Sequence, residues 1–138
     1  MALGRNAKVE LIRSVPLFSR CSKKELAEVA KLADEIDFGP GKELIREGAL
    51  GREFFVLVEG SVDVRRKGRK VNSLGPGDFF GEIALVAHTP RTATVTTATE
   101  VDLLVITAQS FATLLGHQPA IATKVLAALA ERLAPESL

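Results

Sequence analysis

Residues 80–95 read FGEIALVAHTPRTATV. Most of them are small and apolar, but two of them carry opposite charges. Glu82 and Arg91 carry these charges, and charged side chains seldom enter apolar segments without a partner. A glutamate and an arginine nine residues apart often form a salt bridge or lie at two solvated ends. The spacing alone therefore favours a structural pair, with a ligand site as the alternative.

The alternative is an anion site, because the stretch holds two devices that suit a compact anion such as a cyclic phosphodiester. The first is Gly81, which opens the short helical segment EIALVA, where free backbone N–H groups favour negative charge. The second is Arg91, whose planar fork can grip two oxygens at once. Glu82, a pure acceptor when ionised, suits a sugar hydroxyl. Pro90 ends the short helix, so we expect Arg91 to start the strand TATVTT.

The elements around this stretch are predicted to be short strands. Nine of the eleven glycines lie between Gly39 and Gly81, where they mark frequent turns. The segments between the turn signals are rich in β-branched and aromatic residues or alternate in polarity: ELIRE, EFFVLVE, SVDVRR, TATVTT and VDLLVIT. About eight strands over residues 35–107 would form a jelly roll or small barrel.

Both ends of the chain are predicted to be helical. Ser22 stands three residues before Glu25, as in a capping box, and apolar residues follow at helical spacing, which predicts a helix over residues 23–33. Two more helices are expected over about residues 108–134, with the second of them beginning near Pro119.

The length and composition favour one globular domain. The chain has 138 residues, of which 46% are hydrophobic and 25% are charged, and it shows no repeat or linker. We therefore expect a single domain over residues 1–138. Its predicted fold is mainly β with flanking helices, in the α+β class: an eight-stranded antiparallel β-roll or jelly roll, an N-terminal helical segment and two C-terminal helices.

The charge, cysteine and histidine counts exclude several classes of function. Lysine plus arginine number 18 and aspartate plus glutamate 17, a balance that favours neither nucleic acid nor membranes as partners. Cys21 has no partner for a disulfide, and His88 and His117 are too few for a zinc-type site. The sequence shows no signal peptide and no apolar run near the roughly 20 residues of a membrane span. We expect a cytoplasmic protein without a metal.

The opening stretch resembles the phosphate-binding cassette of cyclic nucleotide-binding domains. The matching residues are F-G-E-I-A-L followed, after four residues, by P-R-T-A-T-V. These domains regulate cAMP- and cGMP-dependent kinases, gated channels and bacterial regulators of the catabolite-activator type. The segments VEGSVDV, LGPGDFFGE and VPLF also look like parts of the family, and the resemblance runs from about Val15 to Leu133.

The resemblance implies a regulatory domain rather than an enzyme, with cAMP or cGMP as its ligand and no cofactor. Glu82 would accept the ribose 2′-hydroxyl, and Arg91 would pair with the cyclic phosphate. The residues implied to bind the ligand are Gly81, Glu82, Ile83, Ala84, Arg91, Thr92 and Ala93. Binding would shift the C-terminal helices, with the moving contact at Phe111, Leu114 and Leu115.

The base and the partners stay open at this point. A hydroxyl after the arginine, as in Thr92, looks like the domains that accept cGMP, but family members that bind cAMP also carry threonine or serine there. The family usually caps the base from its last helix, where the candidates, or plain core residues, are Leu126, Leu129, Arg132 and Leu133. The broad apolar face of that helix is compatible with a homodimer, and an effector in a longer chain is the other option. No helix-turn-helix follows, so a DNA-binding module is not expected.

Two other signals have competing interpretations. The basic run Arg65, Arg66, Lys67, Arg69 and Lys70 around Gly68 is typical of a solvated hairpin tip, with nucleic acid or an acidic partner as the alternative. Phe54, Phe55, Phe79 and Phe80 are predicted to form core and pocket wall. Three hypotheses remain: a nucleotide sensor, a module of the same fold that binds proteins instead, and a metal-dependent barrel enzyme of the cupin type.

Overall fold

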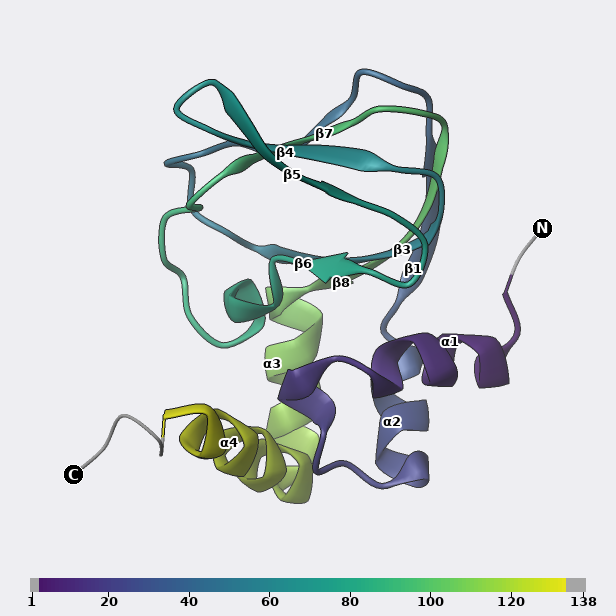
Figure 1. The fold of residues 1–138 in the computed structure, drawn as a ribbon. Helices are drawn as coiled ribbons and strands as arrows, with labels where there is room; N and C mark the ends of the chain where they lie inside the picture. The colour runs from purple at the N-terminus through teal and green to yellow at the C-terminus, as the bar shows by residue number, and fades with distance from the viewer. Residues whose placement is uncertain (1–2, 134–138) are drawn as a thin grey trace. The chain divides into compact units, whose positions relative to one another are not determined.

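The computed structural model describes residues 3–133 of the chain. These residues form two compact units: a β unit over Asp34–Gln109, and a helical unit built from the residues that precede and follow it. Figure 1 shows the strands and helices of the two units.

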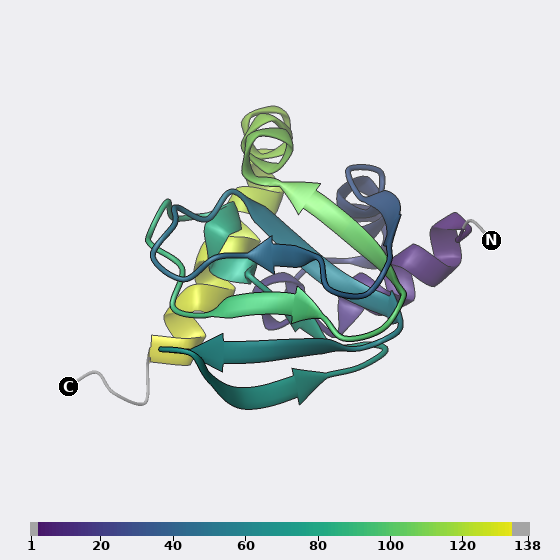
Figure 2. The same ribbon diagram turned by 90° about the horizontal axis from the view of Figure 1, so that it is seen from above.

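The β unit contains two four-stranded antiparallel sheets within the described residues, which confirms the predicted β-roll. One sheet has the order β1-β8-β3-β6, and the other, seen nearly face-on in Figure 2, has the order β2-β7-β4-β5. The strands are β1 (Asp34–Phe38), β2 (Glu43–Ile45), β3 (Glu53–Glu59), β4 (Val62–Arg66), β5 (Arg69–Leu74), β6 (Phe79–Phe80), β7 (Thr94–Thr97) and β8 (Val101–Thr107).

The space between the sheets is filled by inward-facing residues at alternate positions of the strands. β8 contributes Leu103, which is fully buried, and β3 contributes Leu57, which lies opposite Leu103 in the ladder. The same cluster contains Val62 of β4 and Val95 of β7 from the other sheet. This alternation follows from the two-residue period of a strand, and it fixes which side chains of β4 and β7 face the interior.

The helical unit is formed by α1 (Arg5–Arg13), a 3₁₀ turn η1 (Pro16–Phe18), α2 (Lys23–Ala30), most of α3 (Ala108–His117) and α4 (Pro119–Leu133). The capping box predicted at the start of α2 is present: the Ser22 N–H donates to Glu25 at 2.8 Å, and the Glu25 N–H donates to Ser22 Oγ at 3.2 Å. Phe18 and Phe111 pack edge to face at 5.7 Å between ring centroids.

Three features of the fold differ from the sequence-based expectation. α2 ends at Ala30 instead of residue 33, because Leu32 and Ala33 continue in tighter turns whose N–H groups donate to Val29 and Ala30. α1 was not expected, although Val9 and Ile12 have helical spacing and are buried. The strands β1, β5 and β6 lie outside the segments with a clear strand pattern, since they are charged, polar or only two residues long.

Candidate functional site

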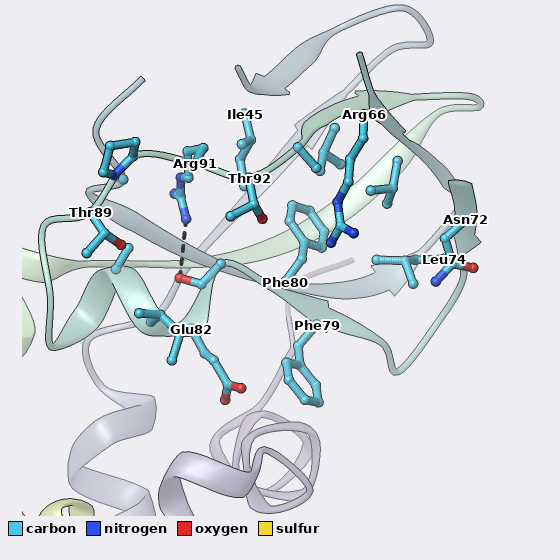
Figure 3. A pocket seen from close by; sticks show the side chains of 18 residues that line it. Ile45, Arg66, Asn72, Leu74, Phe79, Phe80, Glu82, Thr89, Arg91 and Thr92 are labelled. Atoms are coloured by element: carbon cyan, nitrogen blue, oxygen red, sulfur yellow. Dashed lines mark hydrogen bonds between the residues drawn. The ribbon is translucent and has the colours of Figure 1, made fainter. Parts of the chain in front are cut away.

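A pocket of about 480 Å³ opens in the β unit, and Figure 3 shows the side chains around it. All the residues that line it belong to residues 45–95, so it lies within one compact unit. The structure places every residue expected to bind the ligand in its wall: Gly81, Glu82, Ile83, Ala84, Arg91, Thr92 and Ala93. Their contact with a ligand stays a prediction.

The backbone of Arg91 is held by a loop from another part of the chain. The Arg91 N–H donates to the Ala49 carbonyl oxygen at 2.7 Å, and the Gly48 N–H donates to the Arg91 carbonyl oxygen at 2.8 Å. Leu50 and Pro90 form an isolated β-bridge next to these bonds. The expectation that Arg91 starts a strand is therefore wrong: β7 begins at Thr94, because the main chain of Arg91 pairs with this loop and not with a strand.

The side chain of Arg91 lies in a slot between two glycines. A Cβ atom added to Gly51 would lie 2.8 Å from Arg91 Cζ, and one added to Gly81 would lie 2.7 Å from Arg91 Nη1. Both distances are shorter than any normal contact, so the slot exists only because these positions lack a side chain. The glycines thus admit a guanidinium to the pocket wall.

Two backbone carbonyl groups accept hydrogen bonds from the guanidinium. Arg91 Nη2 donates to the carbonyl oxygen of Glu53 at 2.5 Å, and Nη1 donates to that of Gly81 in a longer contact of 3.4 Å. Burial lowers the pKa of Arg91, and the nearby carboxylate of Glu53 raises it in part. Since an arginine in a protein stays protonated and has five N–H donors, three donors remain for another acceptor.

The segment after Gly81 is shorter than the predicted helix EIALVA. It is a single 3₁₀ turn, η2 (Glu82–Leu85), and it starts from Gly81 in a left-handed conformation with φ 81°. The Ala84 N–H already donates to the Gly81 carbonyl oxygen at 3.1 Å within this turn. A four-residue turn has little dipole to offer an anion, so Arg91 is the main source of positive charge on this side of the pocket.

The carboxylate of Glu82 points away from the Arg91 guanidinium in Figure 3. The two charges therefore lie apart, and the salt bridge that the spacing favours is wrong for this structure. The guanidinium uses backbone carbonyls, which carry no net charge and which an anion can replace.

The opposite side of the pocket is formed by the strands and is largely apolar. Phe79 and Phe80 of β6 line it, and Phe80 stacks on the buried Phe55 with ring centroids 5.0 Å apart. The prediction that the phenylalanines form core and pocket wall is confirmed, since Phe54 is also fully buried. An apolar wall with a few polar groups is typical of a pocket for a small organic ligand.

Several residues of the pocket wall escaped the sequence analysis, among them three with a distinct role in the wall. Gly51 stands in one of many glycine-containing turns, and only its contact with Arg91 singles it out. Asn72 belongs to β5, which has a weak strand pattern. Arg66 belongs to the basic run, whose hairpin is present with its turn at Lys67 and Gly68, but Arg66 lines the pocket. The alternation Val62, Val64, Arg66 was the available signal.

The candidates for capping the base all belong to α4, and their contact with a ligand stays a prediction. Leu126 is 67% exposed and Leu129 is partly buried. The backbone of Arg132 and Leu133 is helical, but the positions of their side chains lie outside the described part of the chain. Among the candidates for a moving contact, Phe111 is fully buried, Leu114 is 9% exposed and Leu115 is partly buried.

Two further findings concern residues 3–133 alone. Within this range, His, Cys, Asp and Glu form no group of three or more that is arranged to hold a metal ion. No helix of the same range is both long enough and apolar enough to span a bilayer. His88, the one histidine in the opening stretch, is exposed to solvent.

The chain was compared with known families, curated proteins and solved structures. Residues 35–118 match the family model described as cyclic nucleotide-binding domain. A cyclic nucleotide-gated potassium channel of Rhizobium etli is 37% identical over 89% of this chain and 34% of the channel. A cAMP-dependent protein kinase regulatory subunit of Mycosarcoma maydis is 34% identical over 93% of this chain and 25% of that protein. The chain thus spans about a third of the channel and a quarter of the kinase regulatory subunit.

One solved structure is similar to this chain over almost the full length of both chains. It is the N-terminal domain of a transcriptional regulator from Streptomyces coelicolor A3(2), with a TM-score of 0.83 and 33% identity. The match covers 92% of this chain and 94% of that one. The fold described above is therefore shared with this solved domain.

Proposed function

The chain belongs to the cyclic nucleotide-binding domain family, and we propose that it is a sensor domain that binds cAMP or cGMP in the pocket beside Arg91. The ligand would regulate a partner protein or an effector elsewhere in a longer chain. The family is a regulatory one, and no catalytic residue or cofactor is part of the proposal.

The observation that carries this proposal is the position of Arg91. Its guanidinium is permanently charged and partly buried, and within residues 3–133 its hydrogen bonds go to neutral carbonyl oxygens, with donors left over at the wall of an open pocket. The nearby Glu53 carboxylate offsets the effect of burial only in part, so an anion bound beside the guanidinium would stabilise it further. The single charge of a cyclic phosphate, shared by two oxygens, matches the two-pronged fork.

Glu82 is the proposed partner of the ribose 2′-hydroxyl. Its carboxylate accepts hydrogen bonds and cannot donate them, so it complements a hydroxyl and repels a phosphate. Because the side chain points away from Arg91 here, binding would require it to rotate toward the pocket. A rotation about side-chain bonds needs no change in the backbone of η2.

The proposed signal is a shift in the C-terminal helices. If two placements of α3 and α4 differ in affinity for the nucleotide, the ligand moves the equilibrium between them by that difference in binding free energy and no more. Phe111, Leu114 and Leu115 of α3 remain the proposed moving contact, and residues of α4 the proposed cap on the base. A homodimer through α4 and a cytoplasmic location, in keeping with the single cysteine, belong to the same proposal.

Titration calorimetry of the purified chain with cAMP, cGMP and linear 5′-AMP tests the proposal. We expect saturable binding of at least one cyclic nucleotide and much weaker binding of 5′-AMP, whose second negative charge exceeds what one arginine neutralises. Silence toward both cyclic nucleotides at millimolar concentration would reject the sensor. It would favour a module of the same fold that binds proteins.

A further inference from the structure

Arg66 occupies the side of the pocket opposite Arg91. It is the last residue of β4 and follows Val62 and Val64 in the series of alternate residues on one face of the strand; its side chain is exposed and lines the pocket. Val62 is fully buried and Val64 packs against the core, whereas Arg66 replaces the next apolar residue with a cation. Figure 3 shows its side chain reaching down into the pocket, on the same side as Asn72 and Leu74.

Two other basic residues of the hairpin, Arg65 and Lys70, differ from Arg66 in their surroundings. Arg65 lies 3.9 Å and Lys70 lies 3.2 Å from the carboxylate of Asp63, so both have an acidic neighbour. The side chain of Arg66 makes no hydrogen bond or ion pair with residues 3–133, and its partner in the ladder is Arg69, a like charge. Like charges directly opposite each other destabilise a hairpin. Residues 3–133 therefore offer Arg66 no hydrogen bond or ion pair, and its donors are available at the pocket wall.

Asn72 lies beside Arg66 in the pocket wall and adds a second donor. Its side-chain oxygen accepts a hydrogen bond from the Ser73 N–H at 2.8 Å, which leaves the NH₂ group available to a ligand. Arg66 has donors only. Arg66 and Asn72 therefore place N–H donors in an otherwise largely apolar wall, where they complement a ligand edge that carries adjacent acceptors.

We propose that Arg66 selects guanine over adenine, so that this domain prefers cGMP to cAMP; the inference rests on the proposed function. With the phosphate at Arg91, the base points to the other side of the pocket, where Arg66 lies. Guanine presents two adjacent acceptors, O6 and N7, which match the arginine fork, while adenine presents N7 next to the N6 amino donor. A guanidinium bonds both acceptors of guanine and faces a donor on adenine. The preference of the chain for guanine follows from this mismatch.

Competitive binding of cGMP, cAMP and cIMP to the full chain tests this assignment. cIMP keeps O6 and N7 but lacks the 2-amino group, so it isolates the edge that Arg66 would contact. We expect Arg66→Ala to weaken the binding of cGMP and cIMP by about 5- to 30-fold and that of cAMP by less than about 2-fold. This is the discrimination expected from one bidentate hydrogen-bonded pair at an exposed site. Arg66→Lys keeps the charge but not the fork, and it should also lose most of the preference.

Arg69→Ala is the matched control, because it removes the same charge from the same hairpin at a position outside the pocket wall. This variant should weaken the binding of all three nucleotides slightly and to the same extent. A uniform loss for the three nucleotides in Arg66→Ala, or the same loss in Arg69→Ala, would show that Arg66 supplies only general electrostatic attraction and would overturn the proposal. A wild-type chain that binds none of the nucleotides would instead reject the proposed function. A wild type that binds them with unchanged selectivity after Arg66→Ala rejects the role of Arg66 alone.

Discussion

Two charged side chains of the β unit, Arg91 and Asp102, are partly withdrawn from water in two different surroundings. Arg91 lies in the loop before β7, in a slot between two glycines, where carbonyl oxygens accept its hydrogen bonds. Asp102 lies on β8, between the buried residues Val101 and Leu103, so it faces away from the core between the sheets. Burial disfavours the charged form of both side chains, but the groups around the two side chains differ.

The neighbours of Asp102 are other carboxylates. Asp37 of β1 and Glu59 of β3 lie opposite it in the two ladders, and Glu35 stands two residues from Asp37 on the same face. Burial first, and then the charges and hydrogen bonds of Glu35 and Asp37, raise the pKa of Asp102 to about 7. Asp102 therefore loses its negative charge by taking up a proton near neutral pH.

Arg91 has no such relief, because a guanidinium does not lose its proton in a protein. Its carbonyl partners satisfy the hydrogen bonds and leave the charge in place, and the nearby Glu53 carboxylate offsets burial only in part, so a bound anion would neutralise the charge further. Withdrawal from water therefore does not by itself mark a binding site. Arg91 should control ligand binding, and Asp102 should control only how stability depends on pH.

The largest expected effect comes from Arg91→Ala. We expect it to weaken cyclic nucleotide binding by about 3 kcal/mol or more, roughly 100-fold, because the phosphate loses its charged partner in a partly desolvated site. Thermal unfolding should change little, since the lost bonds end at only two carbonyl groups. Calorimetry and a melting curve measure the two quantities. An unchanged affinity would place the ligand elsewhere.

The next effect is expected from Glu82→Ala. A hydrogen bond to a charged group contributes about 1.5 to 3 kcal/mol, so ribose nucleotides should lose affinity by roughly 10- to 100-fold. The 2′-deoxy analogues lack the hydroxyl and should lose little. Glu82→Gln is a variant of nearly the same shape, and it should recover part of the affinity. Equal losses for ribose and deoxyribose ligands would refute the assigned role.

A smaller effect is expected from Gly51→Ala, which tests the slot. The added Cβ would lie 2.8 Å from Arg91 Cζ and push the guanidinium out of its rotamer, a strain of about 1 kcal/mol. Affinity for the cyclic nucleotide should fall by roughly 5-fold. Gly39→Ala is the control, because a Cβ there meets no atom within 4 Å. If both alanine variants bind like the wild type, the slot does not position Arg91.

The smallest effect is expected on stability, from Asp102→Asn. The pKa of Asp102 is about 7 in the folded chain against an ordinary value of 3.8, so the folded state binds the proton more tightly than the unfolded state. The stability that the protonated Asp102 gives the folded state is fully present below about pH 4 and is lost as the pH rises through about 7. Asp102→Asn should therefore stabilise the chain at pH 8 by about 1 kcal/mol, the cost of like charges across strands, and change it little at pH 4.

Urea unfolding of the wild type and Asp102→Asn at both pH values measures this difference. Nucleotide affinity should be the same in the two proteins, which separates Asp102 from Arg91. Equal stabilisation at pH 4 and pH 8 would mean that the carboxyl group does not titrate in this range.

Local patterns predicted much of the fold. The capping box at Ser22 and the strands of β3 and β8 follow from residues close together in the sequence, and a short segment is enough to show them. α1 has only two buried residues, and β5 is polar along most of its length, so their patterns are weak. These elements depend on partners from other parts of the chain.

The candidate site was predicted in part, for the same physical reason. The stretch from Gly81 to Ala93 lies in one continuous segment, and all its expected ligand residues line the pocket. The slot at Gly51 and the position of Arg66 depend on loops and strands that meet only after folding. The direction of the Glu82 side chain also depends on the folded surroundings, so spacing alone wrongly favoured a salt bridge.

A crystal structure of the chain with bound cAMP or cGMP would show whether Arg91 binds the phosphate. We predict that the two exocyclic phosphate oxygens accept hydrogen bonds from the guanidinium of Arg91, within about 3 Å, and that the Glu82 carboxylate has turned to the ribose hydroxyl. A nucleotide bound with its phosphate away from Arg91, while the guanidinium still donates to the carbonyl groups of Glu53 and Gly81, would show that Arg91 does not bind the phosphate.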